Sequence, residues 1–176
     1  MKKTILLLTF SFATVVSLFA QAVSKHGSLR VKGTMLVNEK GDSVTLRGMS
    51  YGWHCFWPRF YNAESVAWLK KDWKINVIRA AMGIEPGENS YLKRTEWSQE
   101  KMREVIDAAI KEDIYVIIDW HSHNINLKEA KDFFREMSAT YGRHPHIIYE
   151  IFNEPDEESW EAVKEYSTEI IRTIRE

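Results

Sequence analysis

Short apolar segments alternate with amphipathic segments along most of this chain. Four runs are apolar at consecutive rather than alternate positions, over residues 44–49, 76–82, 115–120 and 147–152. Such runs are typical of parallel strands that are covered on both faces. Apolar positions then recur at helical spacing over residues 63–71, 99–112, 127–141 and 158–175. The pattern predicts four strand–helix units in a single α/β domain.

Residues at the predicted helix ends support these boundaries. Asn62, Ser98 and Asn126 each precede a helix, where such side chains accept hydrogen bonds from the first free backbone N–H groups. Gly142, with Pro145 just beyond, is a typical end for the third helix. Before the first unit, residues 29–46 alternate around the turn cluster 38–42, which predicts a β-hairpin that runs into the first strand.

The spacing of the strands limits the possible folds. They begin at residues 44, 76, 115 and 147, and right-handed crossovers of such units build either a closed barrel or an open doubly wound sheet. An open nucleotide-binding sheet would have a glycine-rich turn and a helix directly after its first strand, and the glycines at 48 and 52 are not followed by that helix. We therefore expect the first four units of a (β/α)8 TIM barrel.

The first residues have the pattern of a secretory signal peptide. Lys2 and Lys3 precede an almost uninterrupted apolar run over residues 5–20, and Ala20-Gln21-Ala22 has the small-x-small pattern of a cleavage site. The run is shorter than the ~20 residues of a membrane-spanning helix. We therefore expect a signal peptide over residues 1–22, cleavage after Ala22, and a secreted or periplasmic domain over residues 23–176 that is not held in the membrane.

Charge, cysteine and tryptophan content narrow the class of partner. The chain has 24 Lys and Arg against 25 Asp and Glu, so nothing favours a nucleic acid or an anionic membrane surface. Cys55 is the only cysteine; we interpret it as a small filler, and the domain must depend on its core for stability. The seven tryptophans serve either core packing or stacking on flat ligands, and four are interpreted as core: Trp68, Trp73, Trp120 and Trp160.

Polar residues gather where the predicted strands end. Arg79 ends the second strand, Asp119 and His121 end the third, and Asn153 and Glu154 follow the fourth. In a parallel barrel all these strand ends open on one face, and that face carries the chemistry. Charged groups are costly to bury unless they are paired, so a convergent set indicates a functional site. Asp119 is interpreted as a structural hydrogen-bonding residue within it.

The same segments resemble glycoside hydrolase family 5, the cellulase-type endoglucanases. Residues 46–53 (LRGMSYGW), 78–82 (IRAAM), 119–121 (DWH) and 148–155 (IYEIFNEP) carry the resemblance in the family's order. The resemblance implies a retaining endo-β-1,4-glucanase that hydrolyses a cellulose-like β-glucan. It implies no metal and no organic cofactor, and a full-length enzyme that is monomeric.

The resemblance also implies a role for each matching residue. Glu154 matches the acid/base that protonates the departing oxygen, and Asn153 matches the residue that hydrogen-bonds the sugar 2-hydroxyl. Arg79 matches the arginine that holds the nucleophile, and His121 matches a substrate-contacting histidine.

The loop after the first strand supplies two further candidates for substrate binding. His54 lies where the family often has a histidine. Trp57 lies beside it and is the candidate for a stacking platform.

The nucleophile is the main departure from the family pattern. It is a glutamate at the end of strand seven in the family, and this chain stops after the fourth unit, so the nucleophile is expected to be missing. Glu150 shares the strand parity of Glu154 but lies lower in the barrel, and Glu85 has no supporting motif; neither is interpreted as a substitute. Residues 23–176 alone are therefore expected to be inactive.

Two alternatives remain open. His121 and His123 form a His-x-His pair, which can bind a metal at the strand end of a barrel hydrolase. From a different class, the chain could be a non-catalytic glucan-binding half-barrel. A chelator separates the first alternative from the glucanase, and the coding sequence after Glu176 separates the second.

Overall fold

The computed structural model describes residues 22–176. Its elements are α1 (Ala22–His26), β1 (Arg30–Lys32), β2 (Met35–Val37), β3 (Gly48–Ser50), the 3-10 helix η1 (Pro58–Phe60), α2 (Ala63–Trp73), β4 (Val77–Gly83), α3 (Thr95–Lys111), β5 (Tyr115–His121), α4 (Leu127–Tyr141), β6 (Ile147–Glu150) and α5 (Trp160–Arg175). Residues 1–21 of the predicted signal peptide lie outside the described part. Within that part, no helix has the length and apolar character to cross a membrane.

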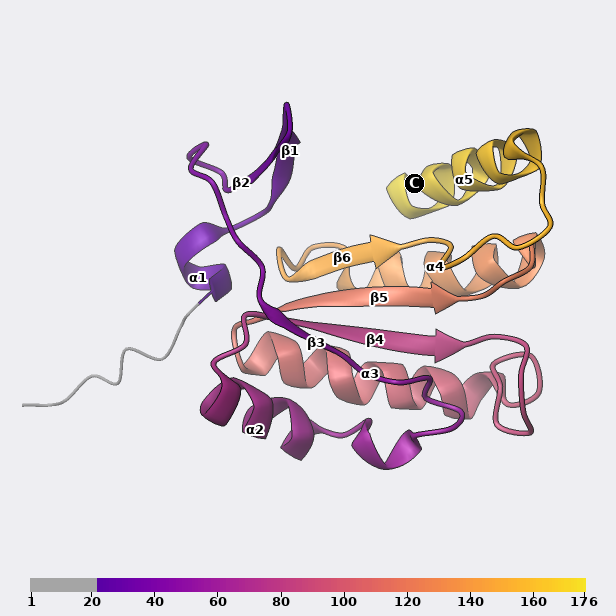
Figure 1. Cartoon of the computed structure of the whole chain (residues 1–176), viewed down its shortest axis with the longest axis horizontal. Coiled ribbons are helices and arrows are strands. Elements are labelled where there is room, and N and C mark those ends of the chain that lie inside the picture. Colours follow the sequence, from indigo (N-terminus) through magenta and orange to yellow (C-terminus); the bar gives the residue numbers. More distant parts are fainter. Residues whose placement is uncertain (1–21) are drawn as a thin grey trace, which may run out of the picture.

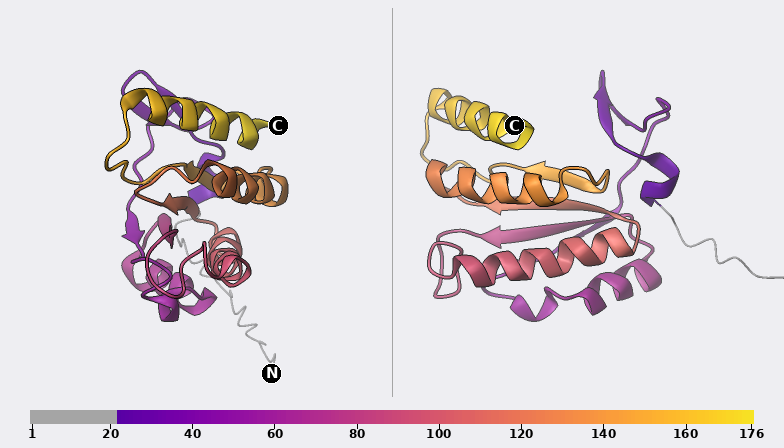
Figure 2. Two further views of the ribbon diagram at one scale, coloured as in Figure 1. Left: turned by 90° about the vertical axis from the view of Figure 1, so that its right-hand side faces the viewer. Right: turned by 180° about the vertical axis from the view of Figure 1, so that it is seen from behind.

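Four parallel strands form one sheet in the order β3-β4-β5-β6, as the alternating pattern predicts. Ser50 pairs with Arg79, Arg79 with Ile117, and Asp119 with Glu150. All four strands point the same way, and their carboxyl ends lie together on the right of Figure 1. Viewed along the strands, the helices form an outer arc around the sheet (Figure 2). The chain is therefore a partial α/β barrel preceded by an antiparallel hairpin.

The first and last strands are shorter than predicted. Asn76 supplies the reason at the first strand, because its side chain accepts from Arg47 N at 2.6 Å and donates to Thr45 O at 2.9 Å. Those backbone groups are therefore bonded to a side chain, and the ladder begins only at Gly48. A Cβ at Gly48 would lie 1.7 Å from Val77 O, so the close approach of β3 to β4 requires glycine there. At the other edge, β6 ends at Glu150, before the predicted end at residue 152.

The predicted hairpin exists, but its turn is at a different place. β1 pairs with β2 with Lys32 opposite Met35, so the chain reverses at Gly33, whose φ of +61° favours glycine. The cluster 38–42 makes a second turn, in which Asn38 N donates to Asp42 O and Asp42 N donates to Asn38 Oδ1 at 2.8 Å. The sequence therefore holds two turns where one was predicted.

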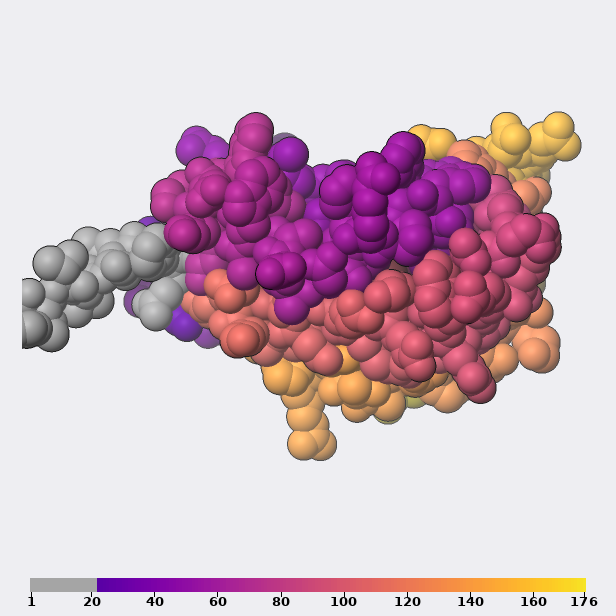
Figure 3. Space-filling view, turned by 90° about the horizontal axis from the view of Figure 1, so that it is seen from below, coloured from indigo at the N-terminus to yellow at the C-terminus, as the bar shows by residue number. Residues whose placement is uncertain are grey.

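The helices follow the amphipathic pattern with three corrections. Asn62 caps α2, accepting from Ser65 N at 2.9 Å, and α4 has the predicted bounds 127–141. Asn126 precedes α4 but makes no capping hydrogen bond, because its side chain donates to Glu85 instead. Ser98, predicted as a cap, lies inside α3 instead and is fully buried. The last helix begins at Trp160, where the side chain of Ser159 forms the cap. From below, the segment of η1 and α2 lies beside α3 and covers one side of the molecule (Figure 3).

The sheet separates two apolar clusters. The larger lies between the strands and the helices and is centred on Trp120, which is fully buried as predicted. The smaller lies on the inner face at the amino ends of the strands, where Ala22 and Val23 of α1 pack on Val77 and Tyr115. The helix α1 therefore covers the amino end of the inner face.

The interpretation of three other tryptophans as core is wrong. The exposed fractions of Trp68, Trp73 and Trp160 are 51%, 61% and 72%. Trp68 and Trp73 lie on α2 and Trp160 begins α5. These two helices follow β3 and β6, the two edge strands, so each has a helix neighbour on one side only among residues 22–176. An amphipathic pattern cannot distinguish a helix in the middle of the layer from one at its end.

Candidate active site

The strand ends bring the predicted polar residues onto the inner face of the sheet. Because side chains alternate along a strand, Ile78 and Ala80 face the helices while Arg79 between them faces inward. Trp120 and Asp119 divide in the same way on β5. The register then places Arg79 near Asp119 and Glu150, from three neighbouring strands. A set of polar residues from distant parts of the sequence therefore meets at one point.

Arg79 is the centre of this set. Its Nε and Nη2 donate to the two carboxylate oxygens of Glu150, each at 2.7 Å. Nη2 also lies 2.8 Å from Asn153 Oδ1 and 2.9 Å from Asp119 Oδ2. Among the residues that the structure describes, Nη1 reaches only Ser50 Oγ, at 3.2 Å. The hydrogen bonds that Arg79 donates to Glu150 raise the pKa of Arg79 further above its already high ordinary value, so the guanidinium is a fixed positive charge.

Asp119 joins Arg79 to His121. Its Oδ2 lies 2.6 Å from His121 Nδ1, and Oδ1 is buried without a partner among the described residues. Burial raises the pKa of Asp119, while His121 and Arg79 oppose that rise. A carboxylate only accepts hydrogen bonds, so Nδ1 of His121 carries the hydrogen and a neutral ring leaves Nε2 as an acceptor. The structural role predicted for Asp119 agrees with this geometry.

Asn153 and Glu154 lie at the mouth of the same cluster. The Oδ1 atom of Asn153 accepts from Arg79, and its Nδ2 is buried with no partner among residues 22–176. The side chain of Glu154 is 71% exposed, and Nδ1 of His123 lies 3.8 Å from its Oε2. Asn153 therefore has one unused donor, and Glu154 is open to a ligand.

Backbone contacts between loops hold Glu154 in place. Its N–H donates to Ser122 O at 3.3 Å, and Asp156 N donates to His123 O at the same distance. Ser122 in turn donates through its hydroxyl to Glu85, which also accepts from Asn126 at 2.7 Å. The loops after β4, β5 and β6 are thus tied to one another beside Glu154.

His54 lies away from the cluster and is fully buried. Its Nδ1 accepts from Gly83 N at 3.0 Å and its Nε2 lies 2.8 Å from Ser98 Oγ. Burial lowers the pKa of His54 to about 4, so the ring is neutral near pH 7. In this arrangement both ring nitrogens are engaged by the protein. The substrate-binding role expected of His54 stays a prediction, and we leave it out of the proposed site.

Trp57 is 46% exposed and lies 5.3 Å below the guanidinium of Arg59. The stacking role expected of Trp57 stays a prediction. Trp53, four residues earlier in the chain, reaches the cluster, although nothing in its spacing predicted this. Its ring lies 4.5 Å from that of His121 and 5.6 Å from that of His123. Aromatic residues crowd this loop, and sequence spacing does not show which of them turns inward.

Close packing explains why Trp53 turns toward the strands. A Cβ at Gly83 would lie 2.7 Å from Cys55 Sγ and 3.0 Å from the ring of Trp53. Glycine at the end of β4 therefore lets the loop lie directly on the strand end. Cys55 is buried there, in agreement with its interpretation as a filler.

The geometry of the His-x-His pair bears on the alternative of a metal site. The rings of His121 and His123 are 6.3 Å apart, and Nδ1 of His121 is engaged by Asp119. In the described part of the chain, no three His, Cys, Asp or Glu side chains are grouped so that they could hold a metal ion.

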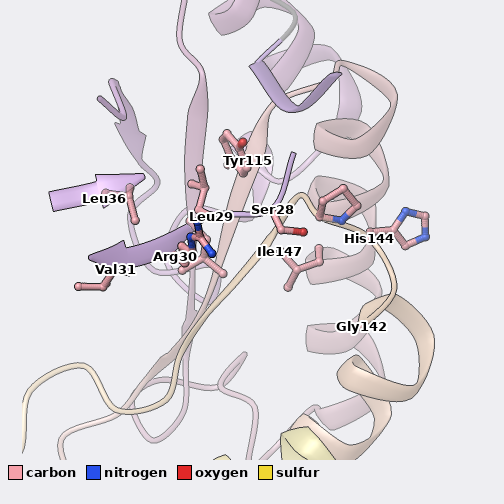
Figure 4. A pocket seen from close by; sticks show the side chains of 11 residues that line it. Ser28, Leu29, Arg30, Val31, Leu36, Tyr115, Gly142, His144 and Ile147 are labelled. Atoms are coloured by element: carbon pink, nitrogen blue, oxygen red, sulfur yellow. The ribbon is translucent and has the colours of Figure 1, made fainter. Parts of the chain in front are cut away.

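A cavity of about 430 Å³ lies at the opposite end of the sheet (Figure 4). It is bounded by Tyr115, the first residue of β5, and by Leu29, Leu36, His144 and Ile147. His121 is the last residue of the same strand, so this cavity and the polar cluster are separated by the length of β5. It is therefore no part of the candidate active site.

Known proteins share both the sequence and the fold. The model of the cellulase family, glycosyl hydrolase family 5, matches residues 37–176. Endoglucanase Z of Dickeya dadantii is 47% identical over 120 residues, which are 66% of this chain and 28% of that protein. Endoglucanase A of Evansella cellulosilytica is 45% identical over 143 residues, which are 77% of this chain and 29% of that protein.

Solved structures agree with these relatives. A structure from Cytophaga hutchinsonii superposes with a TM-score of 0.84 and 46% identity, over 87% of this chain and 51% of that one. The catalytic domain of Thermobifida fusca endoglucanase Cel5A gives a TM-score of 0.80 and 35% identity over the same shares. The chain thus spans about half of these solved chains and less than a third of the two relatives above.

Proposed function

Because the chain belongs to the cellulase family, glycosyl hydrolase family 5, we propose that it carries the proton-donor half of a retaining endo-β-1,4-glucanase. Its similarity to endoglucanases supports this proposal, as does the Thermobifida fusca E355Q variant that was solved with cellotetraose. The observation that carries the proposal is the bond from Arg79 to Asn153 beside the exposed carboxyl of Glu154.

Glu154 acts as the acid and then as the base. It gives its proton to the departing glycosidic oxygen, and afterwards takes a proton from the water that opens the covalent sugar–enzyme intermediate. This double use needs a carboxyl that a ligand can reach. The exposed carboxyl of Glu154 meets this requirement. The hydrogen bond from its backbone N–H to Ser122 O holds the residue in place.

The second carboxylate of the reaction is not supplied by the inward carboxylates of residues 22–176. In retaining glycosidases it lies ~5–5.5 Å from the acid and attacks the sugar. The two inward carboxylates described here are already engaged, Glu150 by Arg79 and Asp119 by Arg79 and His121. The weakly used Nη1 of Arg79 is the donor that would hold the incoming nucleophile.

The remaining groups recognise the sugar. Asn153 has an unused Nδ2 donor for a sugar hydroxyl, and His121 has an acceptor in Nε2. Trp53 and Trp57 offer aromatic surfaces on the adjoining loop, and the apolar faces of pyranose rings pack on such surfaces. These groups fit a β-linked glucan, which presents flat rings with equatorial hydroxyls.

The test is a Glu154→Gln variant of the full-length protein. We expect turnover on carboxymethylcellulose to fall by roughly 1,000-fold or more while glucan affinity changes little, because the acid acts only in the transition state. An aryl cellobioside with a leaving group that needs no protonation should retain its first step. Glu157→Gln, on the exposed loop nearby, is the matched control.

Other outcomes decide between the alternatives. Wild-type turnover with Gln at position 154 would refute the assignment of the acid. Binding of glucan without any turnover by the wild-type protein would favour the non-catalytic binding module. Loss of turnover in a chelator would favour the metal-dependent hydrolase built on His121 and His123.

A further inference from the structure

We propose that Glu150 is a positioning residue for the reaction, because its carboxylate fixes the guanidinium of Arg79 and thereby the side chain of Asn153. The inference rests on the proposed function. Neither the motif pattern nor the family resemblance gives Glu150 a role. Its contacts indicate one.

The contact between Glu150 and Arg79 is a two-point fork. Both carboxylate oxygens are used, Oε2 on Nε and Oε1 on Nη2, at 2.7 Å each. A planar guanidinium held at two of its nitrogens cannot turn about its own axis, so the fork sets the direction of every remaining N–H. A single contact would leave that rotation free.

The fixed orientation reaches Asn153. Nη2 points at Asn153 Oδ1 at 2.8 Å, and an Asn side chain whose oxygen is held by a donor must direct its NH2 group the other way. The unpartnered Nδ2 of Asn153 follows from this arrangement. Glu150 and Glu154 lie on one continuous stretch that includes the end of β6, so the fork also anchors the segment that leads to the acid.

The fork also affects the net charge around Arg79, next to which the nucleophile of the proposed reaction would lie. The charged and titratable side chains around it are Arg79 of β4, Asp119 and His121 of β5, and Tyr61 before α2. Two carboxylates, Glu150 and Asp119, stand against the single positive charge of Arg79. Removing the charge of Glu150 leaves Arg79 less neutralised, so the ionised form of an approaching carboxylate is favoured and its pKa falls.

The experiment uses Glu150→Gln in the full-length protein, with Glu165→Gln on the exposed side of α5 as a control for the same change of charge. On a soluble cello-oligosaccharide we expect kcat to fall about 10- to 100-fold, the cost of a misplaced catalytic group, with KM changed little. The acidic limb of the profile of kcat/KM against pH should move to lower pH. A purely structural role would lower the midpoint of thermal unfolding without moving that limb.

A second variant covers the case in which Gln at position 150 prevents folding. Glu150→Asp keeps the charge but is one methylene shorter, so it should lose kcat as the fork loosens while the acidic limb stays nearer the wild-type position. Wild-type kcat and an unchanged pH profile in either folded variant would overturn the inference. Absence of turnover in the wild-type protein would instead overturn the proposed function, so the two failures are distinguishable.

Discussion

The two faces of the same four strands have opposite characters. Toward the helices, Ile78, Ala80 and Trp120 have no exposed surface and belong to one continuous apolar cluster. Toward the inside, Arg79 and Asp119 occupy intervening positions, and Arg79 pairs with both Asp119 and Glu150. Successive residues of one strand thus point to opposite faces, one into the apolar core and the next into the polar cluster. The difference means that stability and catalysis can be disturbed separately.

The largest expected effect comes from leaving the inner face incomplete. Residues 23–176, expressed alone, should release no measurable reducing sugar from carboxymethylcellulose, because the two inward carboxylates of the described residues, Glu150 and Asp119, are both engaged by Arg79. Such a fragment also has two open sheet edges, β3 and β6, which invite pairing with other chains and poor folding. A Glu154→Gln fragment is the control. Turnover that is present in the wild-type fragment and lost in the control would place a second catalytic carboxylate within these residues.

The next effect belongs to the helix-facing side. Trp120→Ala in the full-length protein should lower the free energy of unfolding by about 3–5 kcal/mol, because it empties a fully buried site. Urea denaturation measures this loss, and the kcat of the remaining folded protein should stay near the wild-type value. Lys128→Ala, whose side chain is 83% exposed on α4, should change stability by less than about 0.5 kcal/mol. Equal losses in the two variants would contradict the assignment of the core.

The third effect appears only as pH falls. Burial lowers the pKa of His54 to about 4 from an ordinary value of 6.5, so below pH 6.5 the unfolded chain binds a proton that the folded chain does not. The stabilisation is therefore complete above pH 6.5 and is lost as pH falls toward 4, by up to about 1.4 kcal/mol per pH unit.

Substitution of His54 measures that contribution. In His54→Gln the free energy of unfolding should depend less on pH between 6.5 and 4, as followed by denaturant titration at several pH values. His144→Gln changes an exposed histidine and should keep the wild-type slope. The same slope in wild type and His54→Gln would show that His54 is not buried as a neutral ring.

Much of the fold could be predicted from the periodicity of apolar residues. Strands that are buried on both faces are apolar at consecutive positions, whereas helices that are buried on one face are apolar at every third or fourth position. The four strands and the exact bounds of α4 follow from this periodicity. The beginning of β3 does not, since it depends on the side chain of Asn76 replacing a ladder bond. The hairpin turn was misplaced for a similar reason: Gly33 and the cluster 38–42 both satisfy the requirements of a turn.

The candidate site could be predicted where strand parity decides direction, and not in the loops. Strand parity placed Arg79 and His121 on the inner face, where both contact Asp119. Asn153 follows the end of β6, so its place beside Arg79 was expected from the shared strand ends and not from parity. Parity also placed Glu150 on the inner face. Its contact with Arg79 could not be predicted, because it depends on how far the two side chains reach along the strands. In the loop after β3 no periodicity exists, so sequence could not show that His54 turns into the core and Trp53 toward His121.

The short helix α1 has a practical consequence for anyone who produces this protein. Ala22 and Val23 are 4% exposed and cover Val77 and Tyr115, and Ser24 bonds through its N–H and hydroxyl to the carboxylate of Asp113 at 3.0 and 2.9 Å. A recombinant gene that starts at Leu29 would omit this cover and leave apolar surface open. An affinity tag fused directly before Val23 would begin at a residue that is almost fully buried, and would disturb the packing around it. A tag at the carboxyl terminus of the complete protein avoids both problems.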